Sequence, residues 1–320
     1  MDPASHASQD ILDRIELLCV VGPTASGKSE LAMAVAERAG AEIVSLDSML
    51  VYRGMDIGTA KPDATMRERV PHHMLDLVGP LDAYDLRRYL ADVRDVLCDV
   101  EERGSRALFV GGTALYLKAL VHGLFPGPPA DRELRARLED EVRAQGVAAA
   151  HQRLAAIDPA AAERIHANDT RRVVRALEVH AQTGRPLSEW QREWGRGEEE
   201  GATGRPRRLI GVRVEDEELE ARIARRTDAM LDAGWAEEAA ALRAAGGLGP
   251  TASAALGYAD VLDWHDGVFD REECVARIVL RTRQFARRQR TWYRKFPEIR
   301  WVGAEASDEA LAAFGWAGDA

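Results

Sequence analysis

The feature that most constrains this fold is a short apolar run, 16–21, followed at once by a glycine-bounded loop. The loop fits the pattern G-x-x-x-x-G-K-[ST] and reads Gly22-Pro23-Thr24-Ala25-Ser26-Gly27-Lys28-Ser29. In such a loop successive backbone N–H groups face a phosphate, the lysine adds positive charge and the last hydroxyl can bind Mg²⁺. The apolar run predicts a buried parallel strand, and the stripe at 31–36 predicts a helix that ends at Gly40. We therefore predict a di- or triphosphate site; a chance glycine-rich turn is the alternative, and it does not require these flanking elements.

Further along the chain, runs that predict strands alternate with stretches of helical periodicity. The predicted strands are 43–46, 74–78, 107–110, 209–214 and 299–302. The clearest helix is 82–102, where apolar residues recur every three or four positions. Because this alternation is typical of a parallel sheet with helices on both faces, we predict an α/β fold with a P-loop NTPase-like parallel sheet.

The composition changes after the turn Pro126-Gly127-Pro128-Pro129, where the sequence becomes rich in Ala, Arg and Glu and no longer predicts strands. We interpret 126–204 as an inserted all-helical domain, whose last part, 195–204, is predicted to be a solvated loop. The P-loop α/β core then comprises 15–125 and 205–303. The ends, 1–14 and 304–320, are predicted to be a flexible N-terminus and a C-terminal tail.

Composition argues against several classes of protein. The 43 Lys and Arg residues against 53 Asp and Glu give a net charge of −10, which is unlike a protein that coats nucleic acid non-specifically. The cysteines, Cys19, Cys98 and Cys274, are too far apart in sequence to indicate a zinc site or a disulfide framework. No segment has the features of a secretory signal or of a membrane-spanning helix, so we expect a cytoplasmic, monomeric protein without membrane contact.

An acidic residue, Asp47, comes directly after the strand predicted at 43–46. The carboxyl ends of parallel strands share one edge of a sheet, so Asp47 should lie beside the phosphate loop. A carboxylate there can accept a proton from an acceptor substrate or bind Mg²⁺, which favours group transfer over motor-type hydrolysis. The alternative is that Asp47 only caps a helix, as an Asp-Ser pair does well.

Together with the phosphate loop, several motifs resemble those of the tRNA dimethylallyltransferases. The most specific is Asp47-Ser48 followed by 51–62, which contains Gly54-Met55-Asp56-Ile57-Gly58-Thr59-Ala60-Lys61-Pro62. The others are 110–116, 164–179, Gly257-Tyr258 and 282–294, so the resemblance spans roughly residues 17–302.

This resemblance implies transfer of a dimethylallyl group from dimethylallyl diphosphate to the exocyclic N6 amine of the adenine just 3′ of a tRNA anticodon. Pyrophosphate leaves and Mg²⁺ assists, so the loop at 22–29 would hold the donor diphosphate and not ATP, with Ser29 on the metal. Asp47, Lys28 and Thr24 become the expected catalytic residues, with Asp47 as the proton acceptor. The tRNA contacts implied for the anticodon stem-loop are Asp47, Ser48, Met49, Leu50, Thr113, Arg135, Arg171, Arg172, Val173, Val174 and Arg175.

Some of these positions have a second interpretation. Many members of the family have Gln where this chain has Leu50, and a leucine side chain cannot hydrogen-bond an adenine edge. Thr113 is explained nearly as well as the N-cap of its own helix. Any one of the arginines would also fit a surface ion pair.

Between 275 and 297 the chain carries eight basic residues and no acidic one. On a helix, Ile278, Phe285 and Trp292 would form an apolar stripe with arginines around the rest. We interpret this segment as a surface that binds tRNA or another anion; a solvated helix face is the alternative. The basic residues are Arg277, Arg281, Arg283, Arg287, Arg288, Arg290, Arg294 and Lys295.

Three other functions stay open at this point. A prenyltransferase that acts on free AMP, ADP or ATP would share the loop and Asp47 but would need less basic surface and a smaller insertion. A P-loop kinase of a small molecule would hold ATP in the loop. A tRNA-binding protein without activity would not need Lys28, Ser29 and Asp47 together.

Overall fold

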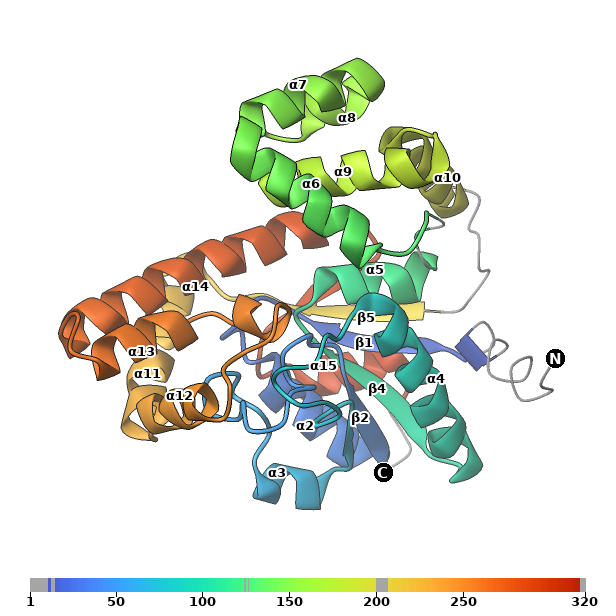
Figure 1. Ribbon diagram of the computed structural model, residues 1–320. Helices are drawn as coiled ribbons and strands as arrows, with labels where there is room; N and C mark the ends of the chain where they lie inside the picture. Colours follow the sequence, from blue (N-terminus) through green and yellow to red (C-terminus); the bar gives the residue numbers. More distant parts are fainter. Residues whose placement is uncertain (1–10, 13–14, 124, 126, 200–206, 317–320) are drawn as a thin grey trace. The chain divides into compact units, whose positions relative to one another are not determined.

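The structure is a computed structural model that describes residues 11–12, 15–123, 125, 127–199 and 207–316 (Figure 1). The chain divides into two compact units, which we call unit 1 (1–121 and 205–320) and unit 2 (122–204). The first boundary lies four residues before the position expected from the sequence, and the second lies between 204 and 205. No helix in the described ranges is long and apolar enough to span a membrane.

A parallel sheet of six strands forms the centre of unit 1, in the order β3-β2-β4-β1-β5-β6. All five residues of β1 are buried, because this strand lies between β4 and β5 and is covered on both faces. The predicted fold class, a parallel α/β sheet flanked by helices, is confirmed. The strands are β1 (Leu17–Val21), β2 (Ala41–Ser45), β3 (His72–His73), β4 (Arg106–Gly111), β5 (Arg207–Val212) and β6 (Arg300–Val302).

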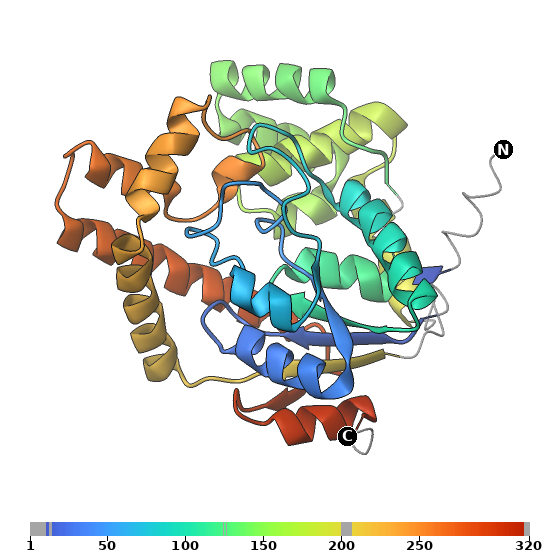
Figure 2. The same cartoon turned by 90° about the horizontal axis from the view of Figure 1, so that it is seen from below.

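Helices cover both faces of this sheet. On one face, α2 and α15 pack with Leu18, Val20 and Ile43 in a single apolar cluster, and Figure 2 views the molecule from this side. On the other face lie α4 and α5, and the Tyr89 hydroxyl of α4 donates to the Ser45 backbone oxygen over 3.0 Å. The helices of unit 1 are α2 (Lys28–Ala39), α3 (Ala64–Arg69), α4 (Leu86–Glu102), α5 (Ala114–His122), α11 (Asp216–Asp232), α12 (Trp235–Ala244), η1 (Ala252–Ala254), α13 (Tyr258–His265), α14 (Arg271–Tyr293) and α15 (Ser307–Phe314).

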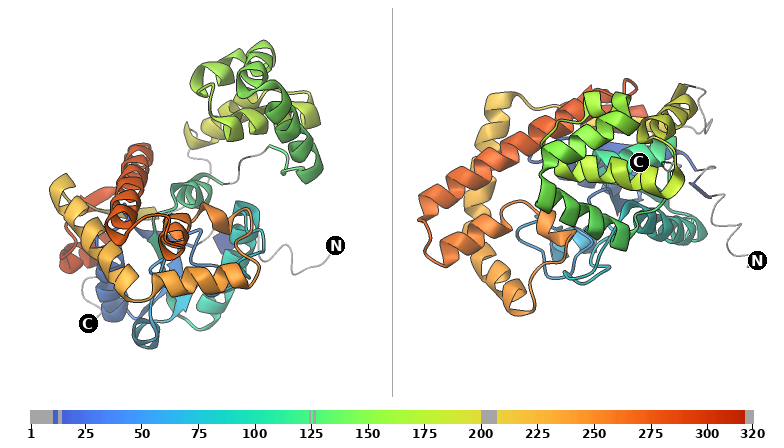
Figure 3. Two further views of the ribbon diagram at one scale, coloured as in Figure 1. Left: turned by 60° about the vertical axis from the view of Figure 1, so that its left-hand side comes forward. Right: turned by 45° about the horizontal axis from the view of Figure 1, so that its top comes forward.

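Unit 2 is helical throughout its described part. Its helices are α6 (Arg132–Gln145), α7 (Val147–Ile157), α8 (Pro159–Arg164), α9 (Thr170–Thr183) and α10 (Leu187–Glu199). Apolar side chains from these helices, among them Leu138, Leu154 and Val173, form a core of their own. The helices lie against one another in both views of Figure 3. The helix α10 continues through 195–199, so the loop predicted at 195–204 is wrong over that stretch, and 200–204 lies outside the described residues.

The third strand differs from the sequence prediction. It is β3, His72–His73, whereas 74–78 is a loop in which only Val78 forms an isolated bridge, to Tyr52. Met74 and Asp76 have positive φ angles of 63° and 56°, which a continuing strand does not allow. The Asp76 carboxylate instead binds Lys61 and Arg67, so the segment is shaped by ion pairs and not by strand pairing.

Both chain ends also differ from expectation where they are described. The residues predicted as a C-terminal tail include α15, whose Ala310, Leu311 and Phe314 are buried against the sheet. Most of the predicted flexible N-terminus, 1–14, lies outside the described residues, but Ile11 and Leu12 are helical and buried.

Candidate active site

An open cavity of about 1590 Å³ lies at the carboxyl-terminal ends of the central strands of unit 1. Its walls come from the turns after β1, β2 and β4, from the segment 56–67, and from α11 and α14. The predicted site residues that line it are Thr24, Ala25, Ser26, Gly27, Lys28, Ser29, Asp47, Ser48, Met49, Leu50 and Thr113. Gly22 and Pro23, the first two residues of the loop, are buried. The sequence therefore identified one continuous site within unit 1.

The phosphate loop adopts the conformation that its glycines permit. Gly27, the N-cap of α2, has a φ of 89°, in the left-handed region that favours glycine. No side chain in the described structure caps α2, so the backbone N–H groups of its first turn are left for a ligand. Because the positive end of the helix dipole lies at the same place, the loop is suited to an anion.

The turn that carries Asp47 is anchored on two sides. Leu46 N donates to Val110 O of β4 over 2.7 Å, and Ser48 N donates to the Thr113 hydroxyl over 3.1 Å. Asp47 Oδ1 accepts from Met49 N over 2.9 Å, and no helix begins here, so the helix-capping alternative for Asp47 is wrong. The Thr113 hydroxyl likewise supports the Asp47 turn.

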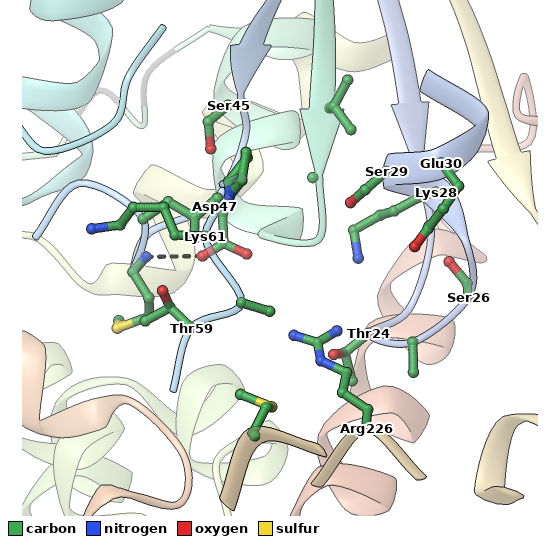
Figure 4. Close-up of a pocket in the computed structure, with 18 of the residues that line it drawn as sticks. Thr24, Ser26, Lys28, Ser29, Glu30, Ser45, Asp47, Thr59, Lys61 and Arg226 are labelled. Carbon is green, nitrogen blue, oxygen red and sulfur yellow. Dashed lines mark hydrogen bonds between the residues drawn. The ribbon is translucent and has the colours of Figure 1, made fainter. Parts of the chain in front are cut away.

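Lys28, Asp47 and Arg226 point into the same part of the cavity (Figure 4). Burial, and after it the neighbouring positive charge of Arg226, lower the pKa of Lys28 to about 8, although the negative charge of Asp47 opposes this shift. Burial also lowers the pKa of Arg226 and raises that of Asp47. Within the described residues neither cation forms an ion pair, and the Lys28 ammonium donates only to Pro23 O, over 3.3 Å. Two enclosed cations without a carboxylate partner indicate a site for a multiply charged anion.

Arg226 and Gln289 are the residues of this site that the sequence interpretation missed. Arg226 comes from α11, and Gln289 from α14 is buried between the phosphate loop and the turn after β4. Neither belongs to a motif that lies near the loop in sequence. The basic run around Arg226 at 222–226, on a helix that follows a strand, is the one signal that would have suggested it.

The arginine-rich segment forms α14, but only part of it is free to bind an anion. Arg281 pairs with Asp260, Arg283 with Glu220 and Arg290 with Asp216, and Arg277 pairs with Glu273 one turn earlier. Arg287, Arg288, Arg294 and Lys295 have no carboxylate partner among the described residues. The buried face differs from the predicted stripe, since Ile278 is buried but Phe285 and Trp292 are only half-buried beside Ala286, Gln289 and Tyr293.

In unit 2, three of the four predicted arginines pair with acidic side chains. Glu178 is fully buried, and its carboxylate accepts from Arg135 over 2.6 Å, from Arg175 over 2.8 Å and from Asp131 N over 2.8 Å. Arg172 pairs with Asp169 over 3.4 Å, whereas Arg171 is exposed and has no partner among the described residues.

The two valines implied as tRNA contacts lie in the core of unit 2. Val173 and Val174 are 0% and 2% exposed. Their side chains therefore cannot contact RNA in this structure, which corrects that expectation for the side chains.

Comparison with known proteins places these features in a family. Residues 50–296 match the family model for IPP transferase, and 15–76 match that for isopentenyl transferase. A tRNA dimethylallyltransferase of Geobacter sulfurreducens is 44% identical over 301 residues, which cover 93% of this chain and 95% of that protein. One from Halorhodospira halophila is 46% identical, with 87% and 89% covered.

Solved structures agree with this result. The full-length tRNA isopentenylpyrophosphate transferase of Bacillus halodurans is 34% identical with a TM-score of 0.66, and the match covers 94% of this chain and 95% of that one. A eukaryotic dimethylallyltransferase, solved while acting on tRNA, is 26% identical with a TM-score of 0.73 over 93% of this chain and 78% of that one. The chain belongs to the IPP transferase family, together with the tRNA dimethylallyltransferases.

Proposed function

We propose that this chain transfers a dimethylallyl group from dimethylallyl diphosphate to the N6 amine of the adenine 3′-adjacent to the anticodon of tRNAs, and releases pyrophosphate. The observation that carries the proposal is the meeting, in one cavity, of a phosphate loop with two enclosed cations and a carboxylate of raised pKa. Names of the relatives and of the solved neighbours support tRNA as the acceptor.

The donor half of the site fits a leaving diphosphate. When the bond between C1 of the allyl group and the diphosphate oxygen breaks, its electron pair stays on the pyrophosphate. The N–H groups of the α2 N-terminus, Lys28 and Arg226 are placed to stabilise that charge. Positive charge that is enclosed by protein and already oriented stabilises the developing anion more than solvent would.

The acceptor half fits a weakly basic amine. The N6 nitrogen attacks C1 of the allyl group, and the new N–C bond leaves one excess proton on N6. Asp47 is placed to take that proton, because one of its oxygens is held by Met49 N while the carboxylate faces the cavity. A base inside a stacked anticodon loop cannot reach this cavity, so the adenine must first leave its stack.

We also propose Mg²⁺ as the cofactor. The candidate donor beside the loop, the Ser29 hydroxyl, is a hard oxygen ligand of the kind that Mg²⁺ prefers. Within the described residues no cluster of three or more His, Cys, Asp or Glu could hold a metal, which suits an ion bound largely by diphosphate and water. When bound, the ion would neutralise charge on the departing pyrophosphate.

The other functions that the sequence left open have less support. A kinase or a prenyltransferase of free nucleotides would use the same loop, but neither accounts for relatives over most of the chain that are named for tRNA. A binding protein without activity does not account for enclosed Lys28 and Arg226 beside Asp47.

The test of this function uses purified protein, Mg²⁺ and radiolabelled dimethylallyl diphosphate. Separate reactions contain unmodified tRNA with adenines at and just after the third anticodon position, AMP, or ATP. Label in tRNA alone is the expected result. Label in AMP or ATP would show that a free nucleotide, and not tRNA, is the acceptor. ATP turnover without label transfer would show that the chain is a kinase.

A further inference from the structure

We propose that Gln289 is a positioning residue that sets the distance between the diphosphate loop and the turn that holds the acceptor carboxylate. The inference rests on the proposed function, because it assigns to Gln289 the alignment of that reaction's two substrates. Gln289 is not expected to touch either substrate. It acts through the backbone of the two loops that bind them.

The geometry of Gln289 is that of a strut between two backbone segments. Its Oε1 accepts from Thr24 N of the phosphate loop over 2.9 Å, and its Nε2 donates to Gly112 O over 2.8 Å. Since a backbone N–H can only donate and a carbonyl can only accept, the amide has one orientation that satisfies both. The side chain is 5% exposed, so water does not compete for either bond.

Each of the two hydrogen bonds of Gln289 connects it to one part of the site, the donor part or the acceptor part. Thr24 precedes the loop residues that lead to Lys28 and to the first turn of α2. Gly112 precedes Thr113, whose hydroxyl accepts from Ser48 N, next to Asp47. A continuous path of covalent and hydrogen bonds therefore joins the phosphate loop to the Asp47 turn, and Gln289 lies at its centre.

The fit around the strut is tight. A methyl group on Gly112 would approach Gln289 Nε2 to 2.4 Å, which explains a glycine at this position. One turn further along α14, the Tyr293 hydroxyl donates to Gly22 O over 3.3 Å, at the start of the phosphate loop. The helix is thus held to the loop at two points, and a shift of either loop would require a shift of a buried helix.

Such a strut matters because transfer depends on the separation of two reacting atoms. The C1 atom of the donor and the N6 nitrogen must meet at about 3–3.5 Å, and a misplacement of about 1 Å costs on the order of 10²-fold in rate. The phosphate loop binds the diphosphate of the donor, and Asp47 takes the proton from the acceptor amine. Their relative position is therefore set by what joins the two loops.

The experiment compares four variants with the wild-type protein. Gln289→Met keeps the length of the side chain and removes both bonds, whereas Gln289→Glu can still accept from Thr24 N but, when ionised, cannot donate to Gly112 O. Gln152→Met and Gln152→Glu are matched controls at an exposed position of α7 that has no assigned role in the site. For each we would measure kcat, the KM for dimethylallyl diphosphate, inhibition by pyrophosphate, tRNA affinity and the thermal unfolding midpoint.

We expect Gln289→Met to lower kcat by roughly 10- to 10²-fold, while the donor KM, pyrophosphate inhibition and tRNA affinity change by less than about threefold. For Gln289→Glu, the rate relative to wild type should rise as the pH falls from 8 to 6, because a protonated carboxyl can donate to Gly112 O again. The Gln152 variants should match wild type in all of these measurements.

Three results would overturn the inference. They are a wild-type kcat in Gln289→Met, a loss of kcat fully explained by the unfolded fraction, and a loss of pyrophosphate binding as large as the loss of rate. A wild-type protein that labels no tRNA would instead overturn the proposed function, so the two failures are distinguishable.

Discussion

Two regions of this molecule contain half-buried arginine or lysine side chains, and they balance the positive charge in opposite ways. In the cavity of unit 1, Lys28 and Arg226 face open space beside Asp47, and neither forms an ion pair within the described residues. In unit 2, Arg135 and Arg175 both bind the fully buried Glu178. Burial lowers the pKa of both Lys28 and Arg226, whereas the charges of Arg135 and Arg175 are balanced by the Glu178 carboxylate.

This difference distinguishes a cation that binds a ligand from one that stabilises the fold. Enclosing a cation without a partner costs free energy, and a fold tolerates that cost where a ligand supplies the missing charge. A cation that satisfies a buried carboxylate has its role inside the fold. The contrast therefore predicts that substitutions in the cavity change chemistry, whereas substitutions around Glu178 change stability.

The largest expected effect comes from Asp47→Asn. The amide keeps the size of the side chain and can still accept from Met49 N, but it cannot take the proton from the amine. We expect the rate constant for transfer to fall by about 10²-fold or more, with tRNA affinity within about threefold of wild type. Single-turnover transfer and filter binding would measure the two effects, and wild-type turnover would exclude Asp47 as the proton acceptor.

Arg226→Ala should have the next largest effect. Loss of a charged hydrogen-bond donor to the diphosphate is expected to lower kcat/KM for the donor by roughly 10- to 10²-fold, since such bonds contribute about 1.5–3 kcal/mol. The matched control is Arg225→Ala, the neighbouring arginine on α11, which is exposed and pairs with Glu218. If both variants lost activity equally, an enclosed unpaired cation would no longer indicate the diphosphate site.

The pH dependence of kcat/KM tests whether the charged form of Lys28 is needed to bind the donor. Its pKa in the free protein is lowered to about 8, so the ammonium is charged below that pH and loses its proton above it. We expect kcat/KM for dimethylallyl diphosphate to fall towards tenfold per unit above pH 8, and to be level below pH 8 until the pH is low enough for Asp47 to take up a proton. In Lys28→Arg the decline should move to higher pH, and an unchanged decline would assign it to another group.

The smallest effects are expected in unit 2, where Arg175 pairs with Glu178 and Arg171 has no partner among the described residues. Arg175→Ala should lower the free energy of unfolding by about 2 kcal/mol, because it leaves the buried Glu178 with one partner fewer. Arg171→Ala should leave stability unchanged and reduce the slope of log affinity for tRNA against log salt by about one. Chemical denaturation and a salt titration would separate them. The reverse pattern would mean that the ion pair with Glu178 opens when tRNA binds.

The sequence predicted those parts of the site whose residues lie close together along the chain. The loop at 22–29 and the acid at the end of the next strand follow local rules, because a strand end fixes where a short turn must lie. Thr24 and Gln289 are 265 positions apart, and no local pattern records which helix will return to the loop. The same reason explains why Arg226 was missed.

Ion pairs account for two further differences from the sequence prediction. The segment 74–78 has the alternation of a strand, yet it is a loop in which Met74 and Asp76 have positive φ and Asp76 binds the buried Lys61. The eight basic residues of 275–297 suggested a continuous anion-binding surface, but acids from α11 and α13 are brought against the helix only in three dimensions. Residue counts along a helix cannot reveal partners that come from elsewhere in the chain.

The strand order has a consequence for how the protein is made. β1 carries the phosphate loop and lies between β4 and β5, but β5 follows unit 2 in the sequence. During synthesis, the edge of β1 that pairs with β5 therefore stays unpaired until the whole of unit 2 has been made. An unpaired strand edge can pair with other chains. The loop is completed later still, when α14 emerges, so a truncated product could fold much of the sheet and yet never close around a donor.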